Sequence, residues 1–182
     1  RSSDLEYTFQ ELVDKAIKIK FDLKSQTNRN TLKSTVEWWK NQSKDVQKLL
    51  LPSDNDVTIK EGIKIFEDYL LKNGVDRNSQ MFCRGPSFDI PIFNSLLKET
   101  YDVEDTFEYE PIKFWNQRDV RTRIEALLLS RGMTETPLPE NLLDGFVKHN
   151  SIHDCAKDVL MLQYAYWYAT GKKEVEKSSI FV

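Results

Sequence analysis

Residues 150–158 of the chain read Asn-Ser-Ile-His-Asp-Cys-Ala-Lys-Asp and lead directly into an apolar, aromatic segment. Ser151 can cap a helix N-terminus, and Asp154 three residues later can complete a capping box, which predicts the start of a helix here. His153 then lies in the first turn and Asp158 deeper inside the helix. Five residues correspond to about 140° of rotation, so both side chains can reach one site only if that site lies over the helix start.

Asp158 has apolar neighbours, which predict that this part of the helix is largely buried. A buried carboxylate is costly unless it is paired or bound to metal. A second carboxylate, Asp89, follows a short apolar run and the Gly85-Pro86 turn, at the edge where parallel sheets collect ligands. If the two carboxylates meet, their repulsion requires a divalent cation or a raised pKa, and oxygen ligands suit Mg²⁺ or Mn²⁺. The simpler interpretations are a helix-dipole acid for Asp89 and a partnerless first-turn residue for His153.

The composition fits one globular domain over residues 1–182, because 182 residues with 40% hydrophobic content can bury a sizeable core. A net charge of −3 requires that any nucleic-acid contact come from local Lys and Arg or from bound cations. Cys83 and Cys155 lack CxxC spacing and indicate two reduced thiols. No apolar run reaches bilayer-spanning length, which favours a soluble, cytoplasmic protein without membrane contact. The start at Arg1, without Met, indicates a processed product, a trimmed chain or a fragment.

Hydrophobic periodicity predicts an α/β chain with a partly parallel sheet. Strict alternation of Ile17, Ile19, Phe21 and Leu23 with polar residues predicts a half-buried strand. The expected elements in order are a strand over 16–23, two helices over 31–51 with Ser43 capping the second, a helix over 57–72 ended by Asn73-Gly74, a strand over 80–84, a helix from 87, a strand over 112–115, a helix over 118–131 and a last helix from 151.

Two of these segments together resemble the DEDD 3′–5′ exonucleases, in the branch with a catalytic histidine, whose fold is ribonuclease H-like. The shared pattern is a strand followed by Gly-x-Ser-Phe-Asp, here residues 85–89, and then His-x-x-x-x-Asp at the start of a C-terminal helix. The chain is most similar to the members from T-even-type bacteriophages. The stretches that carry this likeness are 17–26, 36–43, 114–119, 121–128 and 151–158.

Transferred residue by residue, the resemblance implies roles for three side chains. Asp158 would bind the metal ion that holds the attacking water, Asp89 would support a second ion, and His153 would be the general base. It also implies two Mg²⁺ or Mn²⁺ ions, which generate hydroxide near neutral pH and stabilise charge on the phosphate. Ser87 and Phe88, which flank Asp89, would contact a terminal nucleotide.

Aromatic and basic residues elsewhere are candidate substrate contacts. Trp39 shares the apolar stripe of its helix, so Trp38 is the better candidate to stack on a base. Arg118, Arg121 and Arg123 cluster near the start of a helix, where arginine can meet phosphates, but Arg121 and Arg123 cannot face the same way. We assign Arg118 to the substrate.

One part of the family pattern has no match. The first motif, Asp-x-Glu on the central strand, supplies carboxylates for both metals. Asp4-Leu5-Glu6 has the right letters, but it lies too close to the strand over 16–23 and in no apolar run. The ribonuclease H-like sheet is therefore expected to lack its first strands here. Either the intact protein carries that segment elsewhere, or this chain is inactive alone.

The sequence thus predicts a metal-dependent 3′–5′ exonuclease that acts on the 3′ ends of single-stranded DNA, in the host cytoplasm if it is phage-encoded. The DNA preference rests on the phage resemblance, and an exoribonuclease is the near alternative. A non-catalytic nucleic-acid-binding module is the alternative from another class, because the Asp-x-Glu motif is absent.

Overall fold

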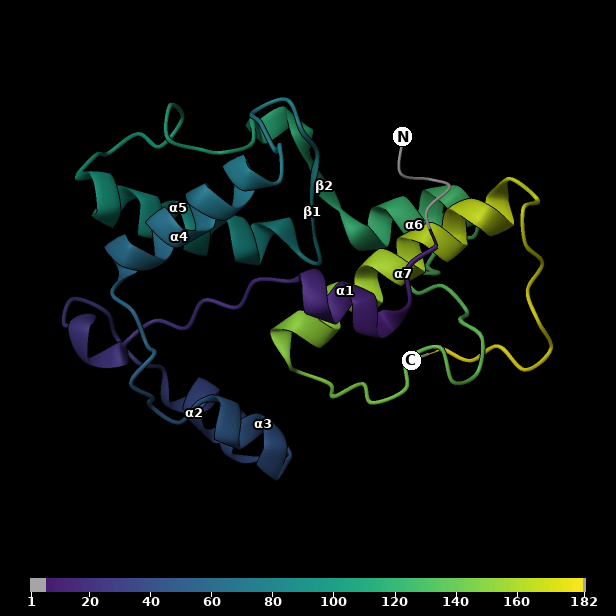
Figure 1. The fold of residues 1–182 in the computed structure, drawn as a ribbon, viewed down its shortest axis with the longest axis horizontal. Coiled ribbons are helices and arrows are strands. Elements are labelled where there is room, and N and C mark those ends of the chain that lie inside the picture. The colour runs from purple at the N-terminus through teal and green to yellow at the C-terminus, as the bar shows by residue number, and fades with distance from the viewer. Residues whose placement is uncertain (1–5, 182) are drawn as a thin grey trace.

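The computed structural model describes residues 6–181, whose arrangement is drawn in Figure 1. Helices dominate this part of the chain and surround one short parallel strand pair. The elements in order are α1 (Phe9–Lys15), a 3₁₀ turn (Leu23–Ser25), α2 (Lys33–Lys40), α3 (Lys44–Leu49), α4 (Ile59–Lys72), β1 (Met81–Cys83), α5 (Pro86–Tyr101), a second 3₁₀ turn (Phe114–Asn116), β2 (Gln117–Asp119), α6 (Val120–Leu128) and α7 (Ser151–Ala169).

The strands β1 and β2 are parallel, with Met81 opposite Gln117 and Cys83 opposite Asp119. Helix α5 makes the crossover between them, as parallel pairing requires. Both strands end at the same edge, where α5 and α6 begin (Figure 1). The predicted strand over 80–84 and the α/β character are therefore confirmed.

The predicted strand over 112–115 is wrong. Ile112 lies in a loop, residues 114–116 form the 3₁₀ turn, and the strand begins only at Gln117. The apolar run has a different cause, because Ile112 is buried in the protein interior whereas Phe114 and Trp115 are exposed. The apolar residues of this run are therefore one buried side chain and two exposed aromatic rings, and they do not indicate a strand.

The predicted strand over 16–23 is also wrong. Phe21 makes a single bridge to Val57, in which the Val57 N–H donates to the Lys20 carbonyl at 2.9 Å and the Asp22 N–H donates to the Val57 carbonyl at 2.8 Å. A strand needs a paired neighbour along its length. Within residues 6–181 this segment has only that one bridge, so its alternating pattern produces an extended crossing over α4.

Gly62 on α4 allows that crossing. A Cβ at this position would collide with the Phe21 ring and lie 2.9 Å from the Ile19 Cγ2 methyl. We expect Gly62→Ala to lower the free energy of unfolding by about 1 kcal/mol, because the overpacking cost exceeds the helix-propensity gain of Ala. Chemical denaturation measures this change. The exposed helix position Lys64→Ala is the control, and a stabilised Gly62→Ala protein would contradict the close contact.

Helix α1 is an element that periodicity did not reveal. Thr8 caps it, and the Glu11 carboxylate accepts a hydrogen bond from the Thr8 N–H at 2.8 Å, which completes a capping box. The Thr-x-x-Glu spacing was readable in the sequence. Phe9, the first residue of α1, is buried against α7 with Ala156 and Leu160.

The other predicted helices are confirmed, with one corrected cap. Ser43 does cap α3, accepting from the Val46 N–H at 3.4 Å. For α7 the cap is Asn150 rather than Ser151, because the Asn150 Oδ1 accepts from the Ile152 N–H at 3.3 Å. Asp154 accepts from the backbone N–H of His149 instead of completing a box with Ser151.

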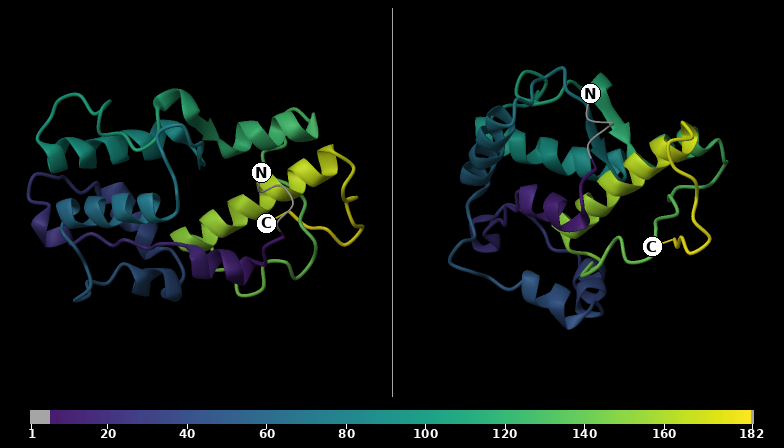
Figure 2. Two further views of the ribbon diagram at one scale, coloured as in Figure 1. Left: turned by 45° about the horizontal axis from the view of Figure 1, so that its top comes forward. Right: turned by 45° about the vertical axis from the view of Figure 1, so that its right-hand side comes forward.

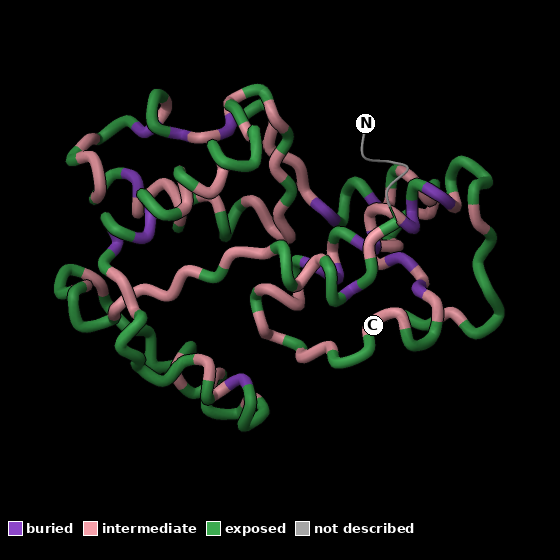
Figure 3. The backbone as a smooth tube through the Cα atoms, viewed as in Figure 1, coloured by how far each residue is buried: buried purple, intermediate pink, exposed green. Residues whose placement is uncertain are grey.

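Buried residues concentrate on both sides of the strand pair (Figure 3). On one side α4 packs against α5 through Ile59, Ile63 and Leu97. On the other, α6 packs across α7, and α1 lies along the first half of α7 (Figure 2). No helix among residues 6–181 is long and apolar enough to cross a membrane.

Candidate functional site

The carboxyl ends of β1 and β2 gather charged side chains from the two strands and three helices. Arg84 follows β1, Asp119 ends β2 and caps α6, and Arg121 lies in the first turn of α6. Asp89 lies in the first turn of α5, and Asp158 approaches from α7. The parallel pairing explains this convergence, since both strands deliver their following residues to one edge.

Arg84 and Asp158 form a two-pronged ion pair at the centre of this group. The Arg84 Nη2 lies 2.7 Å from the Asp158 Oδ1, and the Arg84 Nε lies 2.9 Å from Oδ1 and 3.2 Å from Oδ2. The side chains are only 21% and 16% exposed. The expected partner of the half-buried Asp158 is thus a guanidinium in this structure, and it holds the carboxylate in one orientation.

Asp89 and Asp119 share the influence of Arg121. Partial burial raises the pKa of Asp89, and the Arg121 charge opposes this rise. Asp119 accepts from the Gly85 N–H at 3.1 Å and from the Thr122 N–H at 2.8 Å. These bonds and Arg121 outweigh burial and hold the pKa of Asp119 below its usual value. Asp119 therefore ties the β1–α5 turn to the start of α6.

The Cys155 thiol lies among the carboxylates. Burial of the sulfur, followed by the charges of Asp158, Asp154 and Asp89, raises its pKa, although part of the residue is exposed. Asp89 and Asp158 therefore both lie close enough to act on one sulfur atom. A thiol with a raised pKa stays protonated at neutral pH, which disfavours a reactive thiolate here.

His153 faces a different set of partners. Its Nδ1 accepts from the Val147 N–H at 3.0 Å, and its ring packs edge-on against Phe9, with 5.3 Å between ring centroids. Phe146 lies 6.3 Å away on the same measure. A ring nitrogen that accepts this bond carries no proton, so the neutral ring has its proton on Nε2. Asp89 and Asp158 thus both act on the Cys155 thiol, whereas His153 is held against α1.

The predicted substrate residues lie in three places. Ser87 and Phe88 are exposed beside Asp89, with Phe88 71% exposed. Trp38 is 45% exposed on α2 and contacts the His149 ring edge-on at 4.9 Å. Arg118 lies on β2, and its Nη1 donates to the Trp115 carbonyl at 2.6 Å, away from the carboxylates.

The carboxylates by themselves do not fit a two-metal site. Asp89 and Asp158 supply the oxygen atoms that Mg²⁺ prefers. Yet residues 6–181 contain no group of three or more His, Cys, Asp or Glu side chains placed to hold a metal ion. Arg84 also engages both oxygens of Asp158. Asp4 and Leu5, the rejected match to the first motif, lie outside the described residues.

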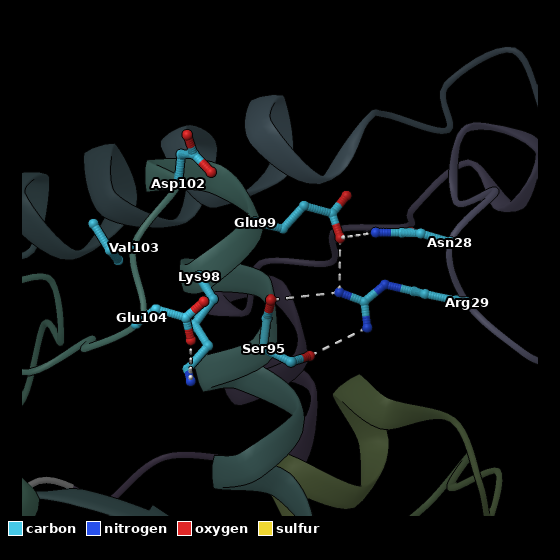
Figure 4. A pocket seen from close by; sticks show the side chains of 8 residues that line it. All are labelled: Asn28, Arg29, Ser95, Lys98, Glu99, Asp102, Val103 and Glu104. Atoms are coloured by element: carbon cyan, nitrogen blue, oxygen red, sulfur yellow. Dashed lines mark hydrogen bonds and ion pairs between the residues drawn. The ribbon is translucent and has the colours of Figure 1, made fainter.

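A pocket at the opposite end of α5 is a separate feature (Figure 4). Its volume is about 510 Å³, and several of its polar side chains hydrogen-bond or pair with one another. Arg29 donates to the Ser95 Oγ at 3.1 Å and pairs with Glu99 at 3.0 Å. The α5 residues that line this pocket, Ser95, Lys98 and Glu99, lie about 9–15 Å along the helix axis from Asp89. We therefore assign the functional site to the strand ends.

Sequence reasoning missed Arg84 and Asp119 and chose Arg118 over Arg121. Arg84 directly precedes the Gly85-Pro86 turn. Asp119 is the N-cap of α6 and accepts from the Thr122 N–H, so both residues occupy positions that can be recognised in the sequence. Their partners, however, lie on separate elements. The helix had been predicted to begin at Arg118, but the strand extends through Asp119 and α6 begins at Val120. Arg121, rather than Arg118, therefore lies in the first turn of the helix.

Two comparisons with known proteins indicate an exonuclease and differ in the nucleic acid that they name. The family model for the Rv2179c-like 3′–5′ exoribonuclease domain matches residues 7–166. An exodeoxyribonuclease of Enterobacteria phage T4 is 55% identical over 176 residues, which cover 92% of this chain and 78% of that protein. No solved structure matches the chain significantly.

Proposed function

The chain belongs to the Rv2179c-like 3′–5′ exoribonuclease domain family, and from this premise we propose that it removes nucleotides from the 3′ ends of single-stranded DNA. The exonuclease resemblance seen in the sequence is confirmed by the family match. The 3′–5′ polarity is a property of the family description. The DNA substrate follows the phage relative, which is 55% identical and described as an exodeoxyribonuclease.

The observation that carries this proposal is the meeting of Asp158 with the turn that leads to Asp89. A C-terminal helix and a strand end 74 residues apart in sequence are joined there by the Arg84–Asp158 pair. Both carboxylates are the ones that the family pattern implicates. Their placement at the carboxyl ends of parallel strands supports a site open to substrate. It also supports the finer proposal of a ribonuclease H-like sheet.

The chain's own residues suit two tasks in phosphodiester hydrolysis. Arg84 and Arg121 carry guanidinium groups at the strand ends, and such groups offer paired N–H donors to phosphate oxygens. His153 would accept the proton of the attacking water. It must first leave the Val147 N–H, because the nitrogen that can take a proton is occupied in this structure. Proton transfer to His153 therefore requires its ring to turn away from α1.

The cofactor in this proposal is Mg²⁺ or Mn²⁺, as two ions. When bound, these ions supply a hydroxide nucleophile near neutral pH and stabilise charge on the phosphate. Asp89 and Asp158 are the ligands that this chain offers. A complete site requires additional oxygen ligands beyond these two.

The test is cleavage of a single-stranded oligonucleotide labelled at its 5′ end. We expect a ladder of products shortened from the 3′ end, loss of cleavage after EDTA, and recovery with Mg²⁺ or Mn²⁺. A 3′-labelled copy should release the label first. Products cut internally or from the 5′ end would overturn the polarity, and EDTA-resistant cleavage would overturn the metal requirement.

RNA is the second candidate substrate, because the family that matches the chain is described as exoribonuclease. Deoxy and ribo oligonucleotides of one sequence distinguish the two, and we expect faster trimming of the deoxy strand. The non-catalytic alternative predicts 3′-end binding without cleavage in metal. Asp158 is paired with Arg84 and is not grouped with other acids, and a complete metal site requires further oxygen ligands. The assay therefore has to include the longest natural form of the protein.

A further inference from the structure

An exposed aromatic cluster lies at the opposite end of the strands from the carboxylates. It consists of Phe107, Phe114 and Trp115, which we call the Trp115 cluster. Phe114 is 59% exposed and Trp115 is 51% exposed. Their ring centroids lie 4.9 Å apart in an edge-to-face arrangement, and Phe107 lies 6.3 Å from each. The 3₁₀ turn that carries two of these rings directly precedes β2 (Figure 1).

Backbone contacts hold this cluster in place. The Lys113 N–H donates to the Arg77 carbonyl at 3.1 Å, and the Asn116 Nδ2 donates to the same carbonyl at 3.4 Å. The Arg77 Nη2 donates to the Phe107 carbonyl at 2.6 Å. Two loops far apart in sequence are thereby joined under the rings. Because the rings are already fixed in position, they lose little conformational freedom when a flat ligand stacks on them.

Cationic side chains surround the rings. The Lys113 ammonium lies 5.5 Å from the Trp115 ring centroid, and the Arg77 guanidinium lies 5.2 Å from that of Phe107. Arg118 reaches toward the Trp115 carbonyl. Arg77 also pairs with Glu108 at 3.2 Å, and Asp105 accepts from the Phe107 N–H at 2.9 Å, so both basic and acidic groups lie beside the rings. Aromatic faces among Lys and Arg match the bases and phosphates of a single nucleic-acid strand.

The Trp115 cluster is continuous with the proposed active site. Trp115 lies in the 3₁₀ turn that directly precedes β2, and Asp119 ends β2, whose three residues span about 10 Å. Phe82, which is exposed, pairs in register with Arg118, so both side chains project from one face of the sheet between the two ends. A single strand can therefore lie across this face from the carboxylates to the rings.

We propose that the Trp115 cluster is a second binding site, which stacks bases of the substrate strand on the 5′ side of the nucleotide being removed. This inference rests on the proposed function, because it assumes that a 3′ end occupies the carboxylate site. Stacking on Trp115 and Phe114 retains long strands without reading their sequence, since every base has an aromatic face. Arg118 and Lys113 contact the phosphates of the same nucleotides.

The test compares binding of long and short single strands to the full chain in EDTA, by fluorescence anisotropy. The probes are oligothymidylates of about 12 and about 3 nucleotides, the longer being within known single-strand site sizes. We expect Trp115→Ala to weaken binding of the long strand by at least about fivefold and to leave the short strand unchanged. Trp115→Phe should restore most of the loss. Tyr166→Ala removes a comparably exposed aromatic ring from α7 and is the matched control.

Trimming of the short strand in Mg²⁺ separates this inference from the proposed function. Unchanged binding of both strands by Trp115→Ala, or equal losses on both, overturns the second site even if trimming proceeds. A selective loss on the long strand supports it even if no trimming is detected. Sedimentation of both proteins completes the test, because a change in oligomeric state with unchanged binding would show that the rings contact another copy of the chain.

Discussion

Replacing His153 with Ala should slow 3′ trimming by about 10²–10⁴-fold, the range that a general base contributes. The rate is measured in a single turnover with enzyme in excess, so that weaker binding does not contribute. The neighbouring histidine provides the control. His149 has a positive φ of 67°, which Asn tolerates, so His149→Asn should retain the rate of the original chain within a few-fold.

The same replacement also affects stability, and this effect must be separated from the effect on the trimming rate. His153→Ala leaves the Val147 N–H without its acceptor and removes the ring from Phe9. An unsatisfied backbone group costs about 1–3 kcal/mol, so the variant should also melt at lower temperature. Assays well below that melting temperature isolate the chemical effect. A His153→Ala protein that is destabilised but trims at the normal rate would show that His153 only anchors α7 to α1.

The resting position of His153 explains why sequence spacing was only partly informative. The helix start and the locations of His153 and Asp158 along α7 were predicted from caps and apolar periodicity, which are local signals. Whether the ring faced the carboxylates depended on α1. That helix was readable only through the Thr8–Glu11 capping box, and its packing against α7 is a long-range contact.

Strands were harder to predict than helices for a related reason. A helix such as α4 satisfies its own backbone and carries its start and stop signals with it, at Thr58 and Asn73. The segment over 16–23 has the alternation of a strand, yet its state depends on which neighbours are available. Only Val57 bridges it among the described residues. The pattern located a half-buried face at Ile17, Ile19 and Phe21, but Leu23 is exposed and the predicted backbone pairing was wrong.

The candidate site was half predictable. Asp89 and Asp158 followed from motif and burial, because an acid among apolar neighbours has to be compensated. The compensating group, Arg84, could not be read from the sequence, since 74 residues separate it from its partner. Arg121, whose charge acts on Asp89 and Asp119, was passed over for Arg118 through a small error in register.

The Arg84–Asp158 pair should dominate the stability of the site as well as its activity. Arg84→Met leaves the Asp158 carboxylate largely buried without its partner, and we expect a loss of about 2–4 kcal/mol in the free energy of unfolding. Asp158→Asn strands the guanidinium and should cost less, because the amide oxygen still accepts a hydrogen bond. It should also abolish measurable trimming under the proposed function.

A double-mutant cycle in EDTA separates the pair from its surroundings. If the contact carries the energy, the double variant should be less destabilised than the sum of the two single variants, by about 1–3 kcal/mol. The exposed Lys48–Asp45 pair, 3.3 Å apart on α3, should show a coupling below about 1 kcal/mol. Additive losses at Arg84 and Asp158 would mean that the two side chains are stabilised by other neighbours. Asp158 would then be free to turn toward a ligand without first displacing a guanidinium, and the site would be open before substrate arrives.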